Sequence, residues 1–400
     1  MKFSKLSQLF LVSSIGLLVA TLLTACELSS IDFVYVASSA GTGTSNYGQI
    51  DTFAVDAASG ALRSVASPVS TGGVNPVAMV VDSAYANLYV ANAGSSTVIR
   101  FAIDSNGGLT QKESATVSAT PVSLAVNAAG TYLYVISGTS SASLTAYPLT
   151  AGAIGTAVAP VSLKVTGFTS DTIIPTGVAV LANNAAVYVA AYDKSAYNPG
   201  GTTTSTANAG WVFGFTAGSG GALTAIAGSP WQAGTKPSAI VAEPTNNYLY
   251  VTDFASNELV AYTIMGGDVL RYLTNGPFRT GNEPVAMVVD PRGKFIYIAN
   301  SLDSNVISYS IDLTTGSPSG SIGLVGTPTD TRPVALTTDP ALGRFVYTAN
   351  YLGNSVSGFR LDPTAGTLSA TQATPYPSDP KPTAIVSIPH GNHATQAVFQ

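Results

Sequence analysis

Charged residues are scarce in this chain, and the scarcity limits what the protein can bind. Only 9% of its 400 residues are charged, and the formal net charge is −5. Binding to a phosphate backbone needs a basic surface, so nucleic acid is not expected as a partner. Disordered chains combine high charge with few aromatic residues, whereas this chain is 46% hydrophobic and 9% aromatic. We therefore expect a folded protein with little electrostatic attraction for polyanions.

Cysteine and histidine are nearly absent. Cys26 is the single cysteine, so no internal disulfide can form. The two histidines, His390 and His393, follow the last expected strand, and we interpret residues 389–400 as a flexible C-terminal tail. No Cys/His metal set and no cofactor are therefore expected. The sequence also lacks a Gly-x-Ser-x-Gly motif and any earlier histidine that could activate a serine nucleophile.

The first 25 residues have the pattern of a secretory signal. A basic start is followed by the apolar run Leu9 to Leu23, which ends in Leu-Thr-Ala-Cys26. This ending resembles the lipobox of bacterial lipoproteins, in which the cysteine is lipidated and becomes the mature N-terminus. The resemblance implies removal of residues 1–25, a short tether over residues 26–30, and a membrane anchor through Cys26 in the bacterial cell envelope, outside the cytoplasm.

Two alternatives to a lipid anchor remain at this point. An ordinary cleaved signal followed by an incidental cysteine would give the same hydrophobic run. A transmembrane anchor is disfavoured, because the run is shorter than a bilayer-spanning helix requires.

A repeat dominates the rest of the sequence. In each copy a proline opens a short apolar stretch, a tyrosine follows in a second stretch, and an aromatic residue follows in a third. The proline-to-tyrosine spacing is 13 residues in five copies and 14 in a sixth. The prolines are Pro76, Pro121, Pro175, Pro237, Pro284, Pro333 and Pro382. The tyrosines are Tyr35, Tyr89, Tyr134, Tyr188, Tyr250, Tyr297 and Tyr347. A fixed period of roughly 40–50 residues built from short strands is typical of a propeller.

The predicted fold is therefore all-β, a seven-bladed β-propeller with four-stranded blades over residues 31–388. The first tyrosine stretch has no proline stretch before it, and the stretch that begins at Pro382 has no tyrosine stretch after it. Together they predict one blade closed by both termini. The tyrosines and the third-stretch aromatics are predicted to pack between neighbouring blades, because a unique ligand site would not recur in every copy.

Three phrases in the repeat carry a family resemblance. Leu88-Tyr-Val-Ala-Asn92, Ile296-Tyr-Ile-Ala-Asn300 and Val346-Tyr-Thr-Ala-Asn350 resemble the YVTN-type propeller repeat. Over residues 31–388 the chain is similar to the lactonase-type seven-bladed family, which includes 6-phosphogluconolactonases and a fungal muconate cycloisomerase. The resemblance implies lactone hydrolysis by histidine, glutamate and arginine near the channel mouth. This chain has no histidine in its blades.

The residue before each blade-opening proline is predicted to lie at one rim of the channel, held extended by the proline. In chain order these residues are Asn75, Thr120, Ile174, Lys236, Glu283, Arg332 and Lys381. Four consecutive blades thus place a charge at this rim. Asp193 and Asp253 follow second strands and are expected on the same face. A long loop between Tyr192 and Gly210 is expected beside them, and such loops often carry binding residues.

Three interpretations of this rim remain open, two of which assign it a function. The first function is a surface-tethered propeller that binds a small anionic or sugar-like ligand, or a protein partner, with Lys236, Arg332 and Lys381 as donors and Asp193 and Asp253 nearby. The second is a lactone hydrolase in which Glu283 acts as the catalytic base, with Arg332 and water. The third possibility is a solvated rim whose charges only compensate one another.

Overall fold

The computed structural model describes residues 30–39, 46–138, 142–165, 172–196, 209–321, 325–391, 393 and 396. The expected signal segment, Cys26 and most of the long loop between Tyr192 and Gly210 lie outside these ranges. The described residues form strands and short 3₁₀ segments, η1 (Ser219–Gly221) and one at residues 391 and 393, with no α-helix among them. None of their helical segments has the length and apolar character needed to cross a membrane.

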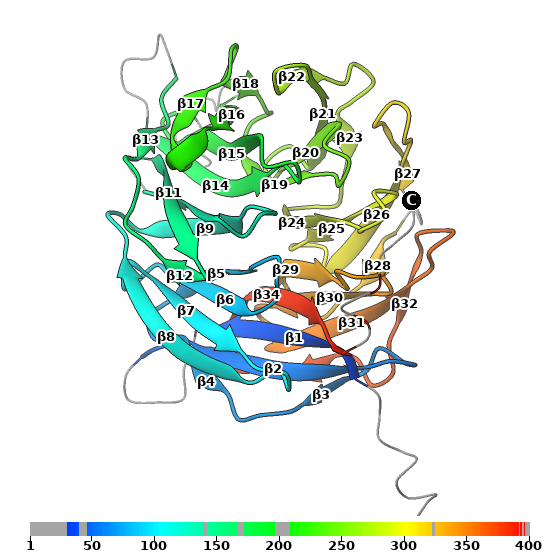
Figure 1. Ribbon diagram of the computed structural model, residues 1–400. Coiled ribbons are helices and arrows are strands. Elements are labelled where there is room, and N and C mark those ends of the chain that lie inside the picture. The colour runs from blue at the N-terminus through cyan, green and yellow to red at the C-terminus, as the bar shows by residue number, and fades with distance from the viewer. Residues whose placement is uncertain are drawn as a thin grey trace, which may run out of the picture.

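Seven antiparallel sheets are arranged around a central axis, each with its first strand innermost (Figure 1). Neighbouring inner strands contact one another around the whole circle, so the ring has no gap. The predicted seven-bladed propeller is thus confirmed. Beginning with the blade shared by the termini, the inner strands are β34 (Pro382–Pro389), β5 (Pro76–Val81), β9 (Pro121–Val126), β14 (Ile173–Val180), β19 (Pro237–Ala242), β24 (Pro284–Val289) and β29 (Pro333–Thr338).

The second and third strands of each blade form the buried core. Their residues are apolar or β-branched and lie between two neighbouring blades, so both faces are covered. The second strands are β1 (Ser30–Ser38), β6 (Asn87–Asn92), β10 (Tyr132–Ser137), β15 (Ala186–Asp193), β20 (Tyr248–Asp253), β25 (Phe295–Asn300) and β30 (Phe345–Asn350). The third strands are β2 (Gln49–Asp56), β7 (Thr97–Ile103), β11 (Ser143–Thr150), β16 (Gly210–Ala217), β21 (Glu258–Met265), β26 (Asn305–Ile311) and β31 (Ser355–Leu361).

The outer, fourth strand is interrupted in six of the seven blades. Two short segments there pair with different ends of the same third strand, whereas β8 (Leu109–Thr116) is continuous. Each blade is therefore four strands wide. The outer segments are β3 (Leu62–Ser64), β4 (Val69–Ser70), β12 (Ala153–Ile154), β13 (Val161–Ser162), β17 (Leu223–Ala225), β18 (Trp231–Gln232), β22 (Val269–Tyr272), β23 (Phe278–Arg279), β27 (Pro318–Ser321), β28 (Thr327–Pro328), β32 (Leu368–Ala370) and β33 (Tyr376–Pro377).

Both ends of the chain contribute to the first blade. Strand β1 pairs with β2 on one side and with the C-terminal β34 on the other, so that Tyr35 lies opposite Val386. The predicted closure is confirmed, and it removes the open sheet edge that each half-blade would otherwise expose.

The tyrosine column joins each blade to the next. Six of the seven tyrosine hydroxyls donate to a backbone carbonyl in the outer turn of the following blade, in the same direction around the ring. These bonds are Tyr35 to Gly107, Tyr89 to Gly152, Tyr188 to Asp268, Tyr250 to Gly316, Tyr297 to Gly366 and Tyr347 to Gly60. Glycine is required at Gly316, which has a φ of 72° and whose added Cβ would lie 2.1 Å from the Tyr248 ring. The packing role predicted for these aromatics is confirmed.

The ring has two distinct ends. At one end, here called the proline rim, the inner strands begin and the second strands finish. At the other end, here called the turn rim, short turns join the inner strand to the second strand in six blades. The first blade has no such turn, because its inner strand is the last strand of the chain and its second strand is the first.

Candidate functional site at the proline rim

In six of the seven blades the residue before the blade-opening proline is held by a repeated hydrogen bond. Its carbonyl accepts the backbone N–H of the residue just after the second strand of the same blade. Examples are Ser301 N–H to Glu283 and Tyr351 N–H to Arg332, at 2.8 Å each, and Phe254 N–H to Lys236 at 2.9 Å. The backbone at this rim is therefore fixed, and differences between blades lie in the side chains.

The backbone conformation of these residues differs from the predicted extended one. Glu283, Arg332 and Lys381 have φ values of 55°, 59° and 59°, in the left-handed region. A β-bulge follows the proline in every blade, also where the preceding residue is not left-handed, so the bulge alone does not produce this conformation. The N–H groups of Glu283, Arg332 and Lys381 donate to side chains of the preceding blade, whereas the N–H of Lys236, which is not left-handed, donates to Asp253 of its own blade. Thr120 and Ile174 avoid this region, as expected for β-branched residues.

Loops of the preceding blade fix the same residues from the other side. The Glu283 N–H donates to Asn257 Oδ1 at 2.9 Å, and the Lys381 N–H donates to Asn354 Oδ1 at 2.9 Å. The Arg332 N–H donates to Ser304 Oγ at 3.3 Å. The side chains of Glu283, Arg332 and Lys381 thus project from a backbone that two blades hold, which is the pre-organisation a binding or catalytic site needs.

Three of the predicted site residues come together. Arg332 Nη1 donates to Glu283 Oε2 at 2.8 Å, and the two side chains retain 42% and 26% of their exposure. Lys236 lies in the blade on the other side of Glu283. Burial lowers the pKa of Lys236, and the nearby Glu283 charge partly offsets that shift. Glu283 therefore forms an ion pair with Arg332 that remains in contact with solvent, and it lies within electrostatic range of Lys236.

Aromatic rings surround the Lys236 ammonium. Its Nζ lies 4.2 Å from the centre of the Phe254 ring and 5.6 Å from that of Tyr192. Both rings belong to the ends of second strands or the residue just after them. Cation–π contacts of this kind hold an ammonium group without neutralising it. An apolar surface thus adjoins the charges, which suits a ligand with both a ring and an anionic group.

Lys381 stands apart from the other three charges. Its side chain is exposed, and among the described residues no ion pair includes its ammonium. Its backbone carbonyl accepts from Ser39 N–H at 2.9 Å. No contact among the described residues joins the Lys381 and Arg332 side chains, so their shared site stays a prediction.

Asp253 and Asp193 are buried and bind the protein itself. Asp253 is fully buried, and its carboxylate accepts four backbone N–H groups, including those of Thr235 and Lys236 at 2.6 and 3.0 Å. Asp193 accepts from the N–H and hydroxyl of Ser195. Their predicted role as ligand-binding groups does not fit this burial. Asp253 instead positions the loop that carries Lys236.

The arrangement at the proline rim suits hydrolysis or anion binding. A carboxylate can accept a proton from water, and two adjacent cations can stabilise negative charge on a reacting oxygen. We refer to Lys236, Glu283 and Arg332 as the mouth cluster.

Sequence reasoning missed a second group of chemistry-bearing residues, at the turn rim. His393 is 4% exposed, and its Nε2 lies 3.0 Å from Asp339 Oδ1 and 3.4 Å from Asp32 Oδ1. The start of the expected flexible tail is therefore fixed, because the imidazole is packed between two carboxylates and Pro389 belongs to β34. Burial, with the neighbouring Asp339 charge, raises the pKa of Asp32 to about 9. The three residues are far apart in sequence, so no local motif signals them.

Comparison with known proteins agrees with the architecture. Residues 22–124 and 219–331 match the family described as "Lactonase, 7-bladed beta-propeller", which is just over half of the chain. No curated protein matches the sequence.

Three solved structures illustrate the similarity of fold. A candidate 6-phosphogluconolactonase from Bacteroides fragilis is 19% identical with a TM-score of 0.72, and the match covers 90% of this chain and 99% of that one. The periplasmic gluconolactonase PpgL of Pseudomonas aeruginosa is 18% identical with a TM-score of 0.73 and the same coverage. A protein from Lactobacillus plantarum is 16% identical with a TM-score of 0.71, over 90% of this chain and 100% of that one. At these identities the likeness concerns the fold alone.

Proposed function

Because this chain belongs to the lactonase family of seven-bladed β-propellers, we propose that it hydrolyses a lactone at the proline rim. The observation that carries the proposal is the mouth cluster, in which the Glu283 carboxylate forms an ion pair with Arg332 and lies within electrostatic range of Lys236. This is the one place at the proline rim where charges from three consecutive blades meet among the described residues.

Each member of the mouth cluster has a role in the proposed reaction. The Glu283 carboxylate accepts a proton from a water molecule, whose oxygen attacks the lactone carbonyl carbon. Arg332 and Lys236 stabilise the negative charge that develops on the carbonyl oxygen. The ring C–O bond then breaks, and the leaving oxygen takes up a proton to give a hydroxycarboxylate. Burial makes Lys236 a better proton donor than an ordinary lysine, because its pKa is lowered.

The charge and surface of the cluster favour a polar or anionic sugar lactone. Two cations and one acid give the site a net positive charge, which attracts a phosphate or carboxylate group. Phe254 and Tyr192 add ring faces on which a sugar could pack. Two of the solved proteins of similar fold carry gluconolactonase names.

The test is hydrolysis of a panel of lactones by the purified protein. The panel comprises 6-phosphogluconolactone, gluconolactone and an unsubstituted lactone, each followed by acid release against the buffer rate. Glu283→Gln keeps the shape of the side chain but removes the base, so we expect kcat/KM to fall by about 10²–10⁴-fold.

A matched control variant is available on the outer strands. Glu113 also forms an ion pair with an arginine, Arg100, at 2.6 Å, but it lies far out on its blade, in β8. Glu113→Gln should leave the rate unchanged. Equal losses in the two variants, or no rate above buffer for any lactone, would contradict the proposed hydrolase.

A second candidate function is ligand binding without catalysis. One observation favours it: Oε2 of Glu283 already accepts a hydrogen bond from Arg332, which leaves fewer acceptor positions on this carboxylate for a nucleophilic water. In that case gluconate or 6-phosphogluconate should bind in calorimetry with no lactone turnover, and Arg332→Ala should remove the binding.

The cellular location stays part of the proposal. We propose that Cys26 carries a lipid that tethers the propeller outside the cytoplasm, on the basis of the lipobox-like residues 23–26. Intact-mass measurement of the protein from membranes should show a diacyl modification, and Cys26→Ala should release the protein from them.

A further inference from the structure

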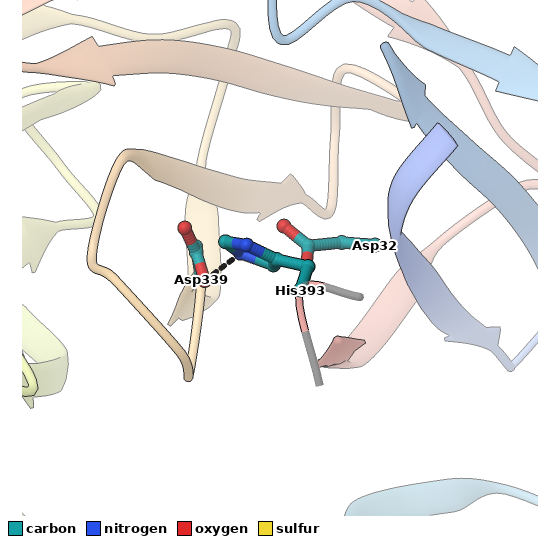
Figure 2. A group of neighbouring side chains, drawn as sticks. All are labelled: Asp32, Asp339 and His393. Atoms are coloured by element: carbon teal, nitrogen blue, oxygen red, sulfur yellow. Dashed lines mark hydrogen bonds and ion pairs between the residues drawn. The ribbon is translucent and has the colours of Figure 1, made fainter. Parts of the chain in front are cut away.

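The strongest unexplained feature of the molecule is the group formed by Asp32, Asp339 and His393. Asp32 is near the start of β1, Asp339 follows the end of β29, and His393 follows β34. Figure 2 shows the imidazole lying between the two carboxyl groups. Their side chains are 3%, 1% and 0% exposed for His393, Asp32 and Asp339. The group lies where the first blade lacks the turn present in the other six.

The two carboxylates differ in how they are satisfied. Asp339 accepts the backbone N–H groups of Ala341, Leu342 and Arg344 at 2.9, 3.1 and 3.0 Å. Asp82 and Asp290 cap the equivalent turns of other blades in the same way. Asp32 has no hydrogen-bond partner on either oxygen among the described residues, although it is almost completely buried. A buried carboxyl group without a partner is costly and rare, so its persistence calls for a missing counterpart.

The hydrogen bonds of His393 identify which ring nitrogen faces the carboxylates. Its Nδ1 lies 2.8 Å from Gln396 Oε1. An amide oxygen only accepts, so Nδ1 carries the proton and donates. Nε2 then faces Asp339 Oδ1 at 3.0 Å and Asp32 Oδ1 at 3.4 Å. It either donates a proton to them or, without a proton, offers its lone pair to a metal ion that the carboxylates also bind. Fixing of the other nitrogen by an outer hydrogen bond is typical of metal-binding histidines.

The distances fit a small metal ion. Two ligand atoms bound at 2.0–2.2 Å with angles of 90–109° lie about 2.8–3.6 Å apart. The observed separations from Nε2 are 3.0 Å to Asp339 Oδ1 and 3.4 Å to Asp32 Oδ1. One ligand atom from each residue can be chosen so that all lie within 4.8 Å of one another. A small shift of Asp32 would complete the set.

Arg344 also contributes positive charge close to the group, but it does not take the place of a cation there. Its guanidinium lies over the Phe345 ring, and Nη2 donates to the Ala57 carbonyl at 3.3 Å. No ion pair between Arg344 and either carboxylate occurs among the described residues. The positive charge of Arg344 therefore lowers the pKa of Asp32 slightly, but Arg344 donates no hydrogen bond to an Asp32 oxygen.

We propose that Asp32, Asp339 and His393 form a site for a divalent transition-metal ion that clamps the closure of the ring. One imidazole nitrogen and two carboxylate oxygens suit Zn²⁺ or Mn²⁺ better than Ca²⁺, which prefers six to eight oxygens. The ion joins the C-terminal segment to the first and last blades. Because the ligands converge only in the folded ring, metal binding stabilises the native state.

The experiment uses the full chain without a histidine tag. Protein stripped with EDTA is titrated with ZnCl₂ and, separately, MnCl₂ by calorimetry, and its thermal unfolding is measured with and without each metal. We expect one ion per chain and a rise in Tm of about 3–5 °C at a hundredfold excess over Kd. Absence of stoichiometric binding of both ions would overturn the proposal.

Two variants and a matched control distinguish this site from adventitious binding. His393→Gln and Asp32→Asn each remove one ligand, and each should weaken binding by more than the roughly 10–100-fold that an outer-shell change costs. His390→Gln is the control, because that ring packs against Phe33 at 4.7 Å and is not in the ligand group. It should bind as the wild type does. Equal weakening in His390→Gln, or retained affinity in both ligand variants, would contradict the site.

Asp32→Asn also keeps the test independent of folding defects. An amide removes the unpaired buried acid while keeping its shape, so the metal-free variant should be at least as stable as the metal-free wild type. Its Tm should no longer respond to Zn²⁺. A retained Zn²⁺-dependent rise in Tm would refute the role of Asp32.

Discussion

The two rims of the ring use charged residues in opposite ways. At the turn rim, polar groups cap the turns and are buried, with their oxygens accepting backbone N–H groups. Asp82, Asn127, Glu243, Asp290 and Asp339 all do this, and Asp339 in addition contacts His393. At the proline rim, Glu283 and Arg332 remain partly exposed and bind each other. Charges satisfied by backbone at repeated positions belong to the scaffold, whereas unrepeated charges paired by side chains mark candidate sites.

Each rim also contains an exception that sharpens the rule. Asp253 lies at the proline rim but accepts four backbone N–H groups, so it belongs to the scaffold. Asp32 lies at the turn rim but has no backbone partner among the described residues. Position in the ring therefore says less about function than the kind of partner does.

Removing a scaffold acid should have the largest effect on stability. Asp290 is fully buried and accepts the N–H groups of Lys294 and Phe295 and the Nε of Arg292. Asp290→Ala leaves these donors and a buried charge without a partner, so we expect a loss of about 3–5 kcal/mol in the free energy of unfolding. Urea denaturation measures it. Lactone turnover by the folded variant should be unchanged, and a turnover defect in folded protein would break the comparison between rims.

A seam between blades should be the next most sensitive place. Tyr297→Phe removes the hydroxyl that donates to the Gly366 carbonyl at 3.0 Å and leaves that buried oxygen unpaired. We expect a loss of about 1–3 kcal/mol, measured by the same denaturation. Tyr47→Phe serves as the control, because Tyr47 is 39% exposed, and it should change stability little. Equal effects would show that the hydroxyl bond is not the cause.

The raised pKa of Asp51 should make the stability of the protein depend on pH. Burial raises the pKa of this carboxyl to about 6 in the folded state, whereas the unfolded chain releases the proton near pH 4. Protonation thus favours folding, and its contribution is fully present below about pH 4 and is lost as the pH rises through about 6. Between pH 4 and 7 the free energy of unfolding of the wild type should fall by about 1–2 kcal/mol more than that of Asp51→Asn. Parallel stability curves from pH 4 to 7 would contradict this.

The smallest expected effect belongs to Lys381. Its exposed side chain has no ion pair with the mouth cluster among the described residues. Lys381→Ala should change kcat/KM by no more than about twofold, whereas Arg332→Ala should lower it at least about tenfold. A large effect of Lys381→Ala would extend the site into the first blade.

The regular part of the molecule was predictable from sequence, because a 13-residue spacing from Pro284 to Tyr297 and its equivalents constrains two strands and a turn. The inter-blade packing of the tyrosines follows from the same period. The pairing of Glu283 with Arg332 was only suggested, since it depends on a left-handed backbone that proline was expected to disfavour. The contact between His393 and Asp32 was missed although the shared blade was predicted, because His393 was interpreted as part of a flexible tail and no local motif links the two residues.

The direction of β1 has a mechanical consequence for a tethered propeller. The strand enters the blade at the turn rim, so a tether ahead of Ser30 would hold the ring by that end and leave the mouth cluster facing outward. Strand β1 is also hydrogen-bonded on both edges, to β2 and β34. A pull along its axis would have to shear two ladders at once instead of peeling one open. The strand that follows the proposed tether is therefore well suited to bear load.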